Sequence, residues 1–240
     1  MPPGPAGSTR LQALGEMALC SSVPTQILIG WTLRLAGWSP LDESGALTLG
    51  FVTALTLLDT AVLIALMVGL MRARGDRPAA LWLGERPVLR EILAGLAFVP
   101  VVFLIGSSLL LTMRTITPQM HNVNVNPFEA LAGNSLQNAA LLGLVAIIAG
   151  GVREELQRAF LLDRFRYLGP PWAAVVVLSV AFGLGHLLQG RDAAVATGAM
   201  GAFWALVYLR RRSSVAPMVS HALFNSLEVL VIVVAGAARS

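Results

Sequence analysis

Two adjacent glutamates stand inside an apolar stretch in the second half of the 240-residue chain, where the local sequence is REELQR over residues 153–158. Arg158 follows Glu154 by four residues and Glu155 by three, so in a helix it can pair with either carboxylate. One acid is then left over. An ionisable group inside a membrane span costs about 2.5–3.5 kcal/mol on insertion scales, so a surplus acid there indicates a purpose. The alternative is that the pair lies at the water-exposed cytoplasmic end of the helix, with Arg153 forming an ion pair with the second carboxylate.

Two further motifs, FGLGH and HALFN, lie in later apolar stretches. In each motif the first and last residues are four apart, so Phe182 shares a helix face with His186, and His221 shares one with Asn225. A lone histidine in a membrane helix usually packs or forms hydrogen bonds. Two such motifs on separate helices, together with a glutamate pair on a third, indicate a common site.

These residue types can hydrolyse an amide. A carboxylate and a neutral imidazole that converge on water can remove its proton, while a second imidazole and an amide can donate hydrogen bonds to a developing oxyanion. We therefore expect Glu154 to be the general base and His186 to hold the water or share the proton. His221 and Asn225 are the expected oxyanion donors. The expected supporting residues are Glu155, Arg158 and Phe182.

A metal mechanism is an open alternative at this stage. Glu154, His186 and His221 could ligate Zn²⁺ with one position left for water, and ligands drawn from three helices have no sequence signature. Otherwise no cofactor is expected. The single cysteine, Cys20, excludes a disulfide framework, a cysteine-rich metal site and an iron–sulfur cluster. The chain has no HExxH, GxSxG or GxGD motif of other intramembrane hydrolases.

The elements that must position these residues are membrane helices. The chain is 56% hydrophobic and only 12% charged, and its mean hydropathy is +0.73, which is typical of a polytopic membrane protein. We predict an all-α fold, a transmembrane helical bundle of about seven spans with a catalytic core formed by the last four. The predicted spans are about 14–36, 46–71, 92–113, 135–162, 172–189, 193–209 and 215–236. All 17 basic residues are arginine, which excludes Schiff-base chemistry and a phosphate loop.

The predicted organisation is a disordered tail at 1–13, transmembrane helices and loops at 14–134, the catalytic core at 135–236 and a C-terminal tail at 237–240. Most arginines outside the spans fall in the loops on the side of the N-terminus. Short loops rich in arginine stay in the cytoplasm, so we expect a cytoplasmic N-terminus and an external C-terminus.

The motifs EELQR, FGLGH and HALFN, in this order on successive apolar stretches, resemble the CPBP family of intramembrane endopeptidases over roughly residues 135–236. This family groups CAAX prenyl proteases with bacteriocin-processing and abortive-infection proteins. The resemblance implies a glutamic-type membrane protease, although the family was long described as metalloproteases. It implies Glu154 as catalytic base, His186 as its partner, and His221 and Asn225 as oxyanion stabilisers.

The composition looks bacterial, so we expect a multi-pass protein of the bacterial inner membrane. By analogy with the family, the expected partners are the lipid bilayer and a membrane-anchored protein or peptide substrate, with no nucleic acid. Peptide maturation or clipping of a membrane-anchored tail is favoured over prenyl processing. Two other classes stay open. One is a non-catalytic immunity or scaffold protein that uses the same residues as a buried polar network, and the other is a small transporter with a proton relay.

Overall fold

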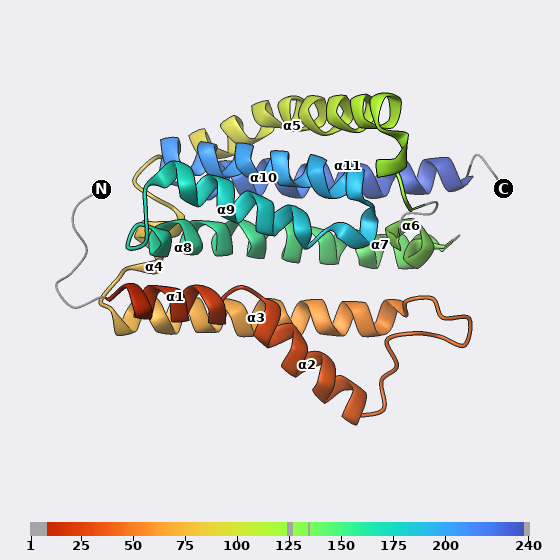
Figure 1. Cartoon of the computed structure of the whole chain (residues 1–240), viewed down its shortest axis with the longest axis horizontal. Coiled ribbons are helices and arrows are strands. Elements are labelled where there is room, and N and C mark those ends of the chain that lie inside the picture. Colours follow the sequence, from red (N-terminus) through yellow and green to blue (C-terminus); the bar gives the residue numbers. More distant parts are fainter. Residues whose placement is uncertain (1–8, 124–126, 134, 238–240) are drawn as a thin grey trace.

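The computed structural model describes residues 9–123, 127–133 and 135–237, and within these ranges the chain is helical, with a single isolated β-bridge between Leu41 and Leu47. The long helices run side by side along the long axis of the molecule (Figure 1). The predicted all-α fold is confirmed. In this arrangement each helix satisfies its own backbone hydrogen bonds, as a lipid environment requires.

Five helices in the described part of the chain are long and apolar enough to cross a membrane. They are α3 (Leu49–Ala73), α5 (Val88–Ile116), the continuous helix Leu136–Phe165, α10 (Arg191–Arg211) and α11 (Val215–Ala237), the last with an apolar segment at Val215–Val234. The chain is therefore a multi-pass membrane protein with fewer long spans than the seven predicted.

The predicted first span is not one helix. The chain breaks after α1 (Arg10–Leu19), where Ser22 has a left-handed φ of 70°, and continues as α2 (Val23–Leu35). At 1.5 Å per residue these helices are only about 15 and 20 Å long, too short to cross about 30 Å of hydrocarbon. The predicted tail at 1–13 is also partly wrong, because α1 begins at Arg10. Its residues 1–8, like 238–240 of the predicted C-terminal tail, lie outside the described residues.

The predicted span at 172–189 is also shorter. Helix α9 covers only Pro171–Leu184 and is capped by Gly185, and a 3₁₀ turn, η3 (Leu187–Gln189), follows. Glycine is a poor helix former, so the paired glycines of FGLGH favour this end. His186 thus lies beyond the end of the helix, although its ring still contacts the Phe182 ring with centroids 4.7 Å apart.

The remaining helices are short. They are α4 (Pro78–Trp82), η1 (Pro118–Met120) and α6 (Pro127–Ala132). The third histidine, His121, lies after η1 and bonds through Nδ1 to the buried Asp192 at 2.9 Å, which also accepts from Arg114 Nε at 3.0 Å. These contacts fasten the loop after α5 to the start of α10.

Two sets of contacts hold the bundle together around the continuous helix Leu136–Phe165. At one end the fully buried Arg164 pairs with Glu16 of α1 at 2.6 Å and with Asp76, just after α3, at 3.0 Å. On the other side α11 packs against α5, where a Cβ added to Gly95 would lie 2.6 Å from Val219 Cβ. Small residues allow this close approach of helices in membranes.

We predict that Gly95→Ala lowers the free energy of unfolding by about 1–3 kcal/mol, because the added methyl overpacks the α5–α11 contact. Gly69→Ala is the matched control, since a Cβ there meets nothing within 4 Å, and it should change stability by no more than about 1 kcal/mol. Thermal unfolding in detergent compares the two. Equal unfolding midpoints would contradict this packing.

Candidate active site

The continuous helix Leu136–Phe165 changes its winding just before the glutamate pair. Residues 136–165 form α7 (Leu136–Val145), a π-helical segment η2 (Ala146–Arg153) and α8 (Glu154–Phe165). A Cβ on Gly150 would lie 2.3 Å from Asn225 Nδ2, and one on Gly151 would lie 2.5 Å from Ala222 Cβ. The glycine pair therefore lets α11 lie directly on the π segment, a form of helix that often occurs at functional sites.

Glu155 is the buried member of the glutamate pair, with 1% of its side chain exposed. Its Oε2 accepts from Arg158 Nε at 3.0 Å, and its Oε1 accepts from Arg158 Nη2 at 3.2 Å and lies 2.9 Å from His221 Nδ1. Both carboxylate oxygens are thus engaged. A buried charge is tolerated when it is paired and hydrogen-bonded in this way.

His221 is held in one orientation by its surroundings. A carboxylate paired with a guanidinium can only accept, so the bond to Glu155 places a proton on His221 Nδ1. The imidazole stacks on the Trp204 ring, with centroids 3.9 Å apart and planes 15° apart, and the Phe182 ring stands edge-on at 6.2 Å. The other nitrogen, Nε2, lies 4.0 Å from Glu154 Oε2. This separation is too long for a direct hydrogen bond.

Glu154 is the more accessible acid, with 18% of its side chain exposed. Its Oε1 accepts from Arg153 Nη2 at 3.2 Å, whereas Oε2 has no hydrogen bond within the described residues. The alternative prediction, that Arg153 pairs with the second carboxylate, therefore applies to Glu154 Oε1 only. Asn225 donates one amide hydrogen to Ala146 O at 3.2 Å, and both its Nδ2 and His221 Nε2 lie beside Gly150. Glu154, His221 and Asn225 thus meet at the π segment.

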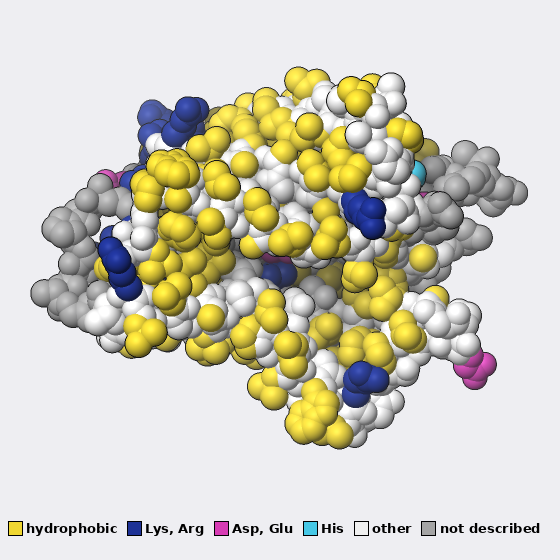
Figure 2. Space-filling model, in the orientation of Figure 1, with side chains coloured by type: hydrophobic (Ala, Val, Ile, Leu, Met, Phe, Trp, Pro, Cys, Tyr) yellow, Lys and Arg dark blue, Asp and Glu magenta, His cyan; other side chains and the backbone are white. Residues whose placement is uncertain are grey.

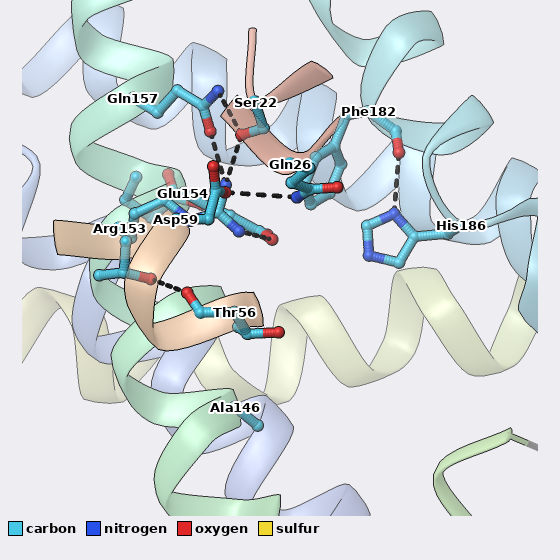
Figure 3. A network of polar contacts seen from close by, with 12 residues as sticks. Ser22, Gln26, Thr56, Asp59, Ala146, Arg153, Glu154, Gln157, Phe182 and His186 are labelled. Carbon is cyan, nitrogen blue, oxygen red and sulfur yellow. Dashed lines mark hydrogen bonds and ion pairs between the residues drawn. The ribbon is translucent and has the colours of Figure 1, made fainter. Parts of the chain in front are cut away.

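His186 reaches this cluster through Phe182. Its Nδ1 donates to Phe182 O at 2.8 Å, a bond that satisfies a carbonyl at the end of α9. The Phe182 ring lies 4.7 Å from the His186 ring and 4.4 Å from the Arg158 guanidinium. His186 makes no hydrogen bond to Glu154, and Figure 3 shows the two separated, with the Gln26 side chain projecting between them in this view.

A buried polar network behind Glu154 was not predicted from the sequence. Arg153 Nη1 donates to Ser22 Oγ at 3.0 Å and to Gln157 Oε1 at 2.9 Å (Figure 3). Gln157 Nε2 donates to Cys20 O at 2.7 Å. The break between α1 and α2 therefore fixes the arginine that pairs with Glu154. Gln157, a polar residue in an apolar stretch, was the one available signal. Nothing in the sequence marked Ser22 or a backbone carbonyl.

The zinc alternative does not fit this arrangement. Within the described residues, no three His, Cys, Asp or Glu side chains lie close enough together to hold a metal ion. Glu154, His186 and His221 therefore do not form a common ligand set. We therefore derive no step through a metal.

The helical fold and the acid–imidazole cluster together define a membrane protein with a built polar site. Residues 136–227 match the family described as type II CAAX prenyl endopeptidase Rce1-like. Over these residues, which are less than half of the chain, the similarity implies an intramembrane protease that acts on membrane proteins. No curated protein and no solved structure matches the chain.

The first motif departs from the family pattern in its spacing. In the CPBP family, which the three motifs resemble, the first motif is EExxxR with arginine four residues after the second glutamate, whereas Arg158 follows Glu155 by three. Counted back from Arg158, the first glutamate position is occupied by Arg153. The residue contacts distinguish the two acids independently of this register, since Glu155 has no free oxygen and Glu154 has one.

We predict that Ser22→Ala lowers the free energy of unfolding by about 1–3 kcal/mol. Ser22 Oγ accepts from buried Arg153 Nη1 at 3.0 Å and Gln157 Nε2 at 3.1 Å, and both donors lose this acceptor. Hydrogen exchange of the α1–α2 junction should accelerate in the same variant. Ser21→Ala is the control: its hydroxyl donates to Ala18 O at an exposed position, and we expect a change within about 0.5 kcal/mol. Identical behaviour of the two variants would contradict a structural role for the junction.

Proposed function

We propose that this protein is a glutamic-type intramembrane endopeptidase in which Glu154 is the general base for attack of water on a peptide bond. One observation carries the proposal: of two adjacent carboxylates, Glu155 is fully engaged by Arg158 and His221, whereas Glu154 keeps Oε2 free and directed towards His221 Nε2. A purely structural network needs no free carboxylate oxygen at this depth.

The first step requires removal of a proton from water. Glu154 Oε2 accepts it, and the water oxygen forms a bond to the carbonyl carbon of the substrate. His186 supports this step as a neutral base, since Nδ1–H is already donated to Phe182 O and the Nε2 lone pair is left to accept from water.

The tetrahedral intermediate places a negative charge on the former carbonyl oxygen. Asn225 Nδ2 has two hydrogens, one of which is donated to Ala146 O, so the second is available to the oxyanion. His221 can donate through Nε2 only as an imidazolium, because Nδ1–H is donated to Glu155. The Glu155 carboxylate and the stacked Trp204 ring both stabilise that cation.

Breakdown of the intermediate returns the proton. The C–N bond breaks, the amine nitrogen receives the proton held by Glu154 or His186, and the carbonyl re-forms as a carboxylic acid. Glu155 and Arg158 act through His221 and are positioning residues. Phe182 has the same kind of role, because its carbonyl orients His186 and its ring contacts Arg158.

The proposal extends to the whole chain. The protease core is residues 135–236, and the helices within 14–134 support it, as the contacts of Ser22 with Arg153 illustrate. The arginine-rich loops favour a cytoplasmic N-terminus in a bacterial inner membrane. The proposed substrate is a membrane-anchored protein or peptide that undergoes maturation or loses a membrane-anchored tail.

One contact favours a second candidate, a non-catalytic immunity or scaffold protein. Glu154 Oε1 is paired with Arg153, which itself bonds to Ser22 and Gln157. A network that served only stability would contain such a pair. This candidate requires Glu154 to contribute to folding and not to turnover.

We predict that Glu154→Gln lowers the cleavage rate by about 10²–10⁴-fold, the usual contribution of a general base, with little loss of stability because the amide oxygen can still accept from Arg153. Glu155→Gln should instead lower the free energy of unfolding by about 3–5 kcal/mol, because it leaves a buried arginine unpaired.

Comparison of membrane-protein C-termini in cells that carry the wild type or Glu154→Gln identifies the substrate. The purified proteins then give the cleavage rate and the free energy of unfolding. A folded Glu154→Gln protein that cleaves at the wild-type rate would refute the assignment. A less stable one, with no cleavage product in either strain, would favour the scaffold.

A further inference from the structure

The end of the bundle away from the His121–Asp192 contact contains a cavity that the proposed protease mechanism does not use. It has a volume of about 410 Å³ and lies between the loop that joins α4 to α5 and the end of α10. Its lining residues are Ala80, Gly84, Glu85, Arg86, Arg210, Arg211 and Arg212. Basic side chains gather over this end of the molecule, at the upper left of Figure 2.

The two loops that form the cavity are fastened to each other. Ser214 N donates to Trp82 O at 2.7 Å, and Tyr208 Oη donates to Leu81 O at 3.1 Å. Gly84 has a left-handed φ of 67°, and a Cβ there would lie 2.1 Å from Arg212 O. Glycine therefore allows the backbones to touch. The backbone part of the cavity wall is therefore fixed by the fold.

The charges around the cavity do not balance. Arg211 donates to the fully buried Glu91 through Nε at 2.8 Å and Nη2 at 2.9 Å, so one guanidinium is fixed at the wall. Arg86 lies 4.0 Å from the same carboxylate and is half exposed. Arg210 and Arg212 have no ion-pair partner among the described residues. Their guanidinium groups give the cavity an excess of positive charge.

Two features oppose this positive charge. Glu85 lines the cavity, and the C-terminal end of α10 carries a partial negative charge equivalent to about half an elementary charge. Four guanidinium groups outweigh these contributions together with Glu91. The net field therefore attracts an anion.

We propose that this cavity binds the phosphate of an anionic phospholipid headgroup. Guanidinium groups match phosphate oxygens with paired hydrogen bonds, and a volume of this size lies within the range of about 300–1,000 Å³ of small-molecule sites. The cavity lies where a long apolar span ends, which is the depth of headgroups, and basic pockets between spans are suited to such lipids. Free phosphate has the same chemistry, so the experiment separates the two sources.

The test compares lipid retention by the purified full-length protein in detergent with equal phosphatidylglycerol and phosphatidylcholine, read by native mass spectrometry. We expect one phosphatidylglycerol retained at least fivefold over phosphatidylcholine, and loss of this preference in Arg210→Gln/Arg212→Gln. The matched control is Arg72→Gln/Arg77→Gln, which removes the same charge from exposed arginines at the same end of the bundle but outside the cavity. It should retain the preference. If both double variants lost the preference for phosphatidylglycerol equally, the proposed site would be wrong, and only a diffuse electrostatic attraction of the anionic lipid would remain.

A second variant separates geometry from charge. Gly84→Ala keeps every arginine but forces the two loops apart. A defined binding site predicts at least a threefold loss of the preference for phosphatidylglycerol, and diffuse attraction predicts no loss.

Inorganic phosphate alone is the ligand in the other arm of the experiment. If it raises the unfolding temperature of the wild type but not of Arg210→Gln/Arg212→Gln, while no lipid preference is seen, the occupant is free phosphate and the lipid assignment fails. Cleavage by these variants tests the protease separately, since none alters the candidate active site.

Discussion

The arrangement of this site depends on one buried carboxylate. Glu155 is almost completely enclosed, and it is tolerated there only because Arg158 and His221 occupy both of its oxygens. Arg158 in turn donates to Gly201 O of α10 at 3.3 Å, so the same group connects α8, α10 and α11. Loss of any partner would leave an unpaired buried charge. The requirement to neutralise Glu155 therefore fixes the position of His221.

Close backbone approach is the second constraint, and it acts around this ion pair. Gly150 and Gly151 leave no side chain between the π segment and α11, so Asn225 can bond to Ala146 O. Gly201 likewise leaves room for the Phe182 ring against α10. The glycines place the polar groups of three helices within reach of one another, and the buried charges then select one arrangement.

The sequence was informative where burial carries a high energetic cost. Glutamates and histidines inside apolar stretches cannot be accidental, so Glu154, His221 and Asn225 could be selected before any coordinates, and the helical fold followed from hydropathy. The contacts of Ser22 and of the Cys20 carbonyl could not be predicted from the sequence, because neither a backbone oxygen nor a left-handed backbone conformation at a serine is visible in the composition. The predicted lengths of two spans were wrong for a related reason. Hydropathy averages the apolar residues of a window and does not detect a helix that ends at Ser22 or Gly185.

The proton positions on the histidines test this account most directly. The chain has three histidines, so ¹⁵N NMR of histidine-labelled protein in detergent is tractable, with His121→Gln and His186→Gln for assignment. The account predicts that His221 and His186 each carry a proton on Nδ1. A neutral His221 with a proton on Nε2 and a bare Nδ1 would contradict the pairing with Glu155, and with it the assignment of Glu154 as the free base.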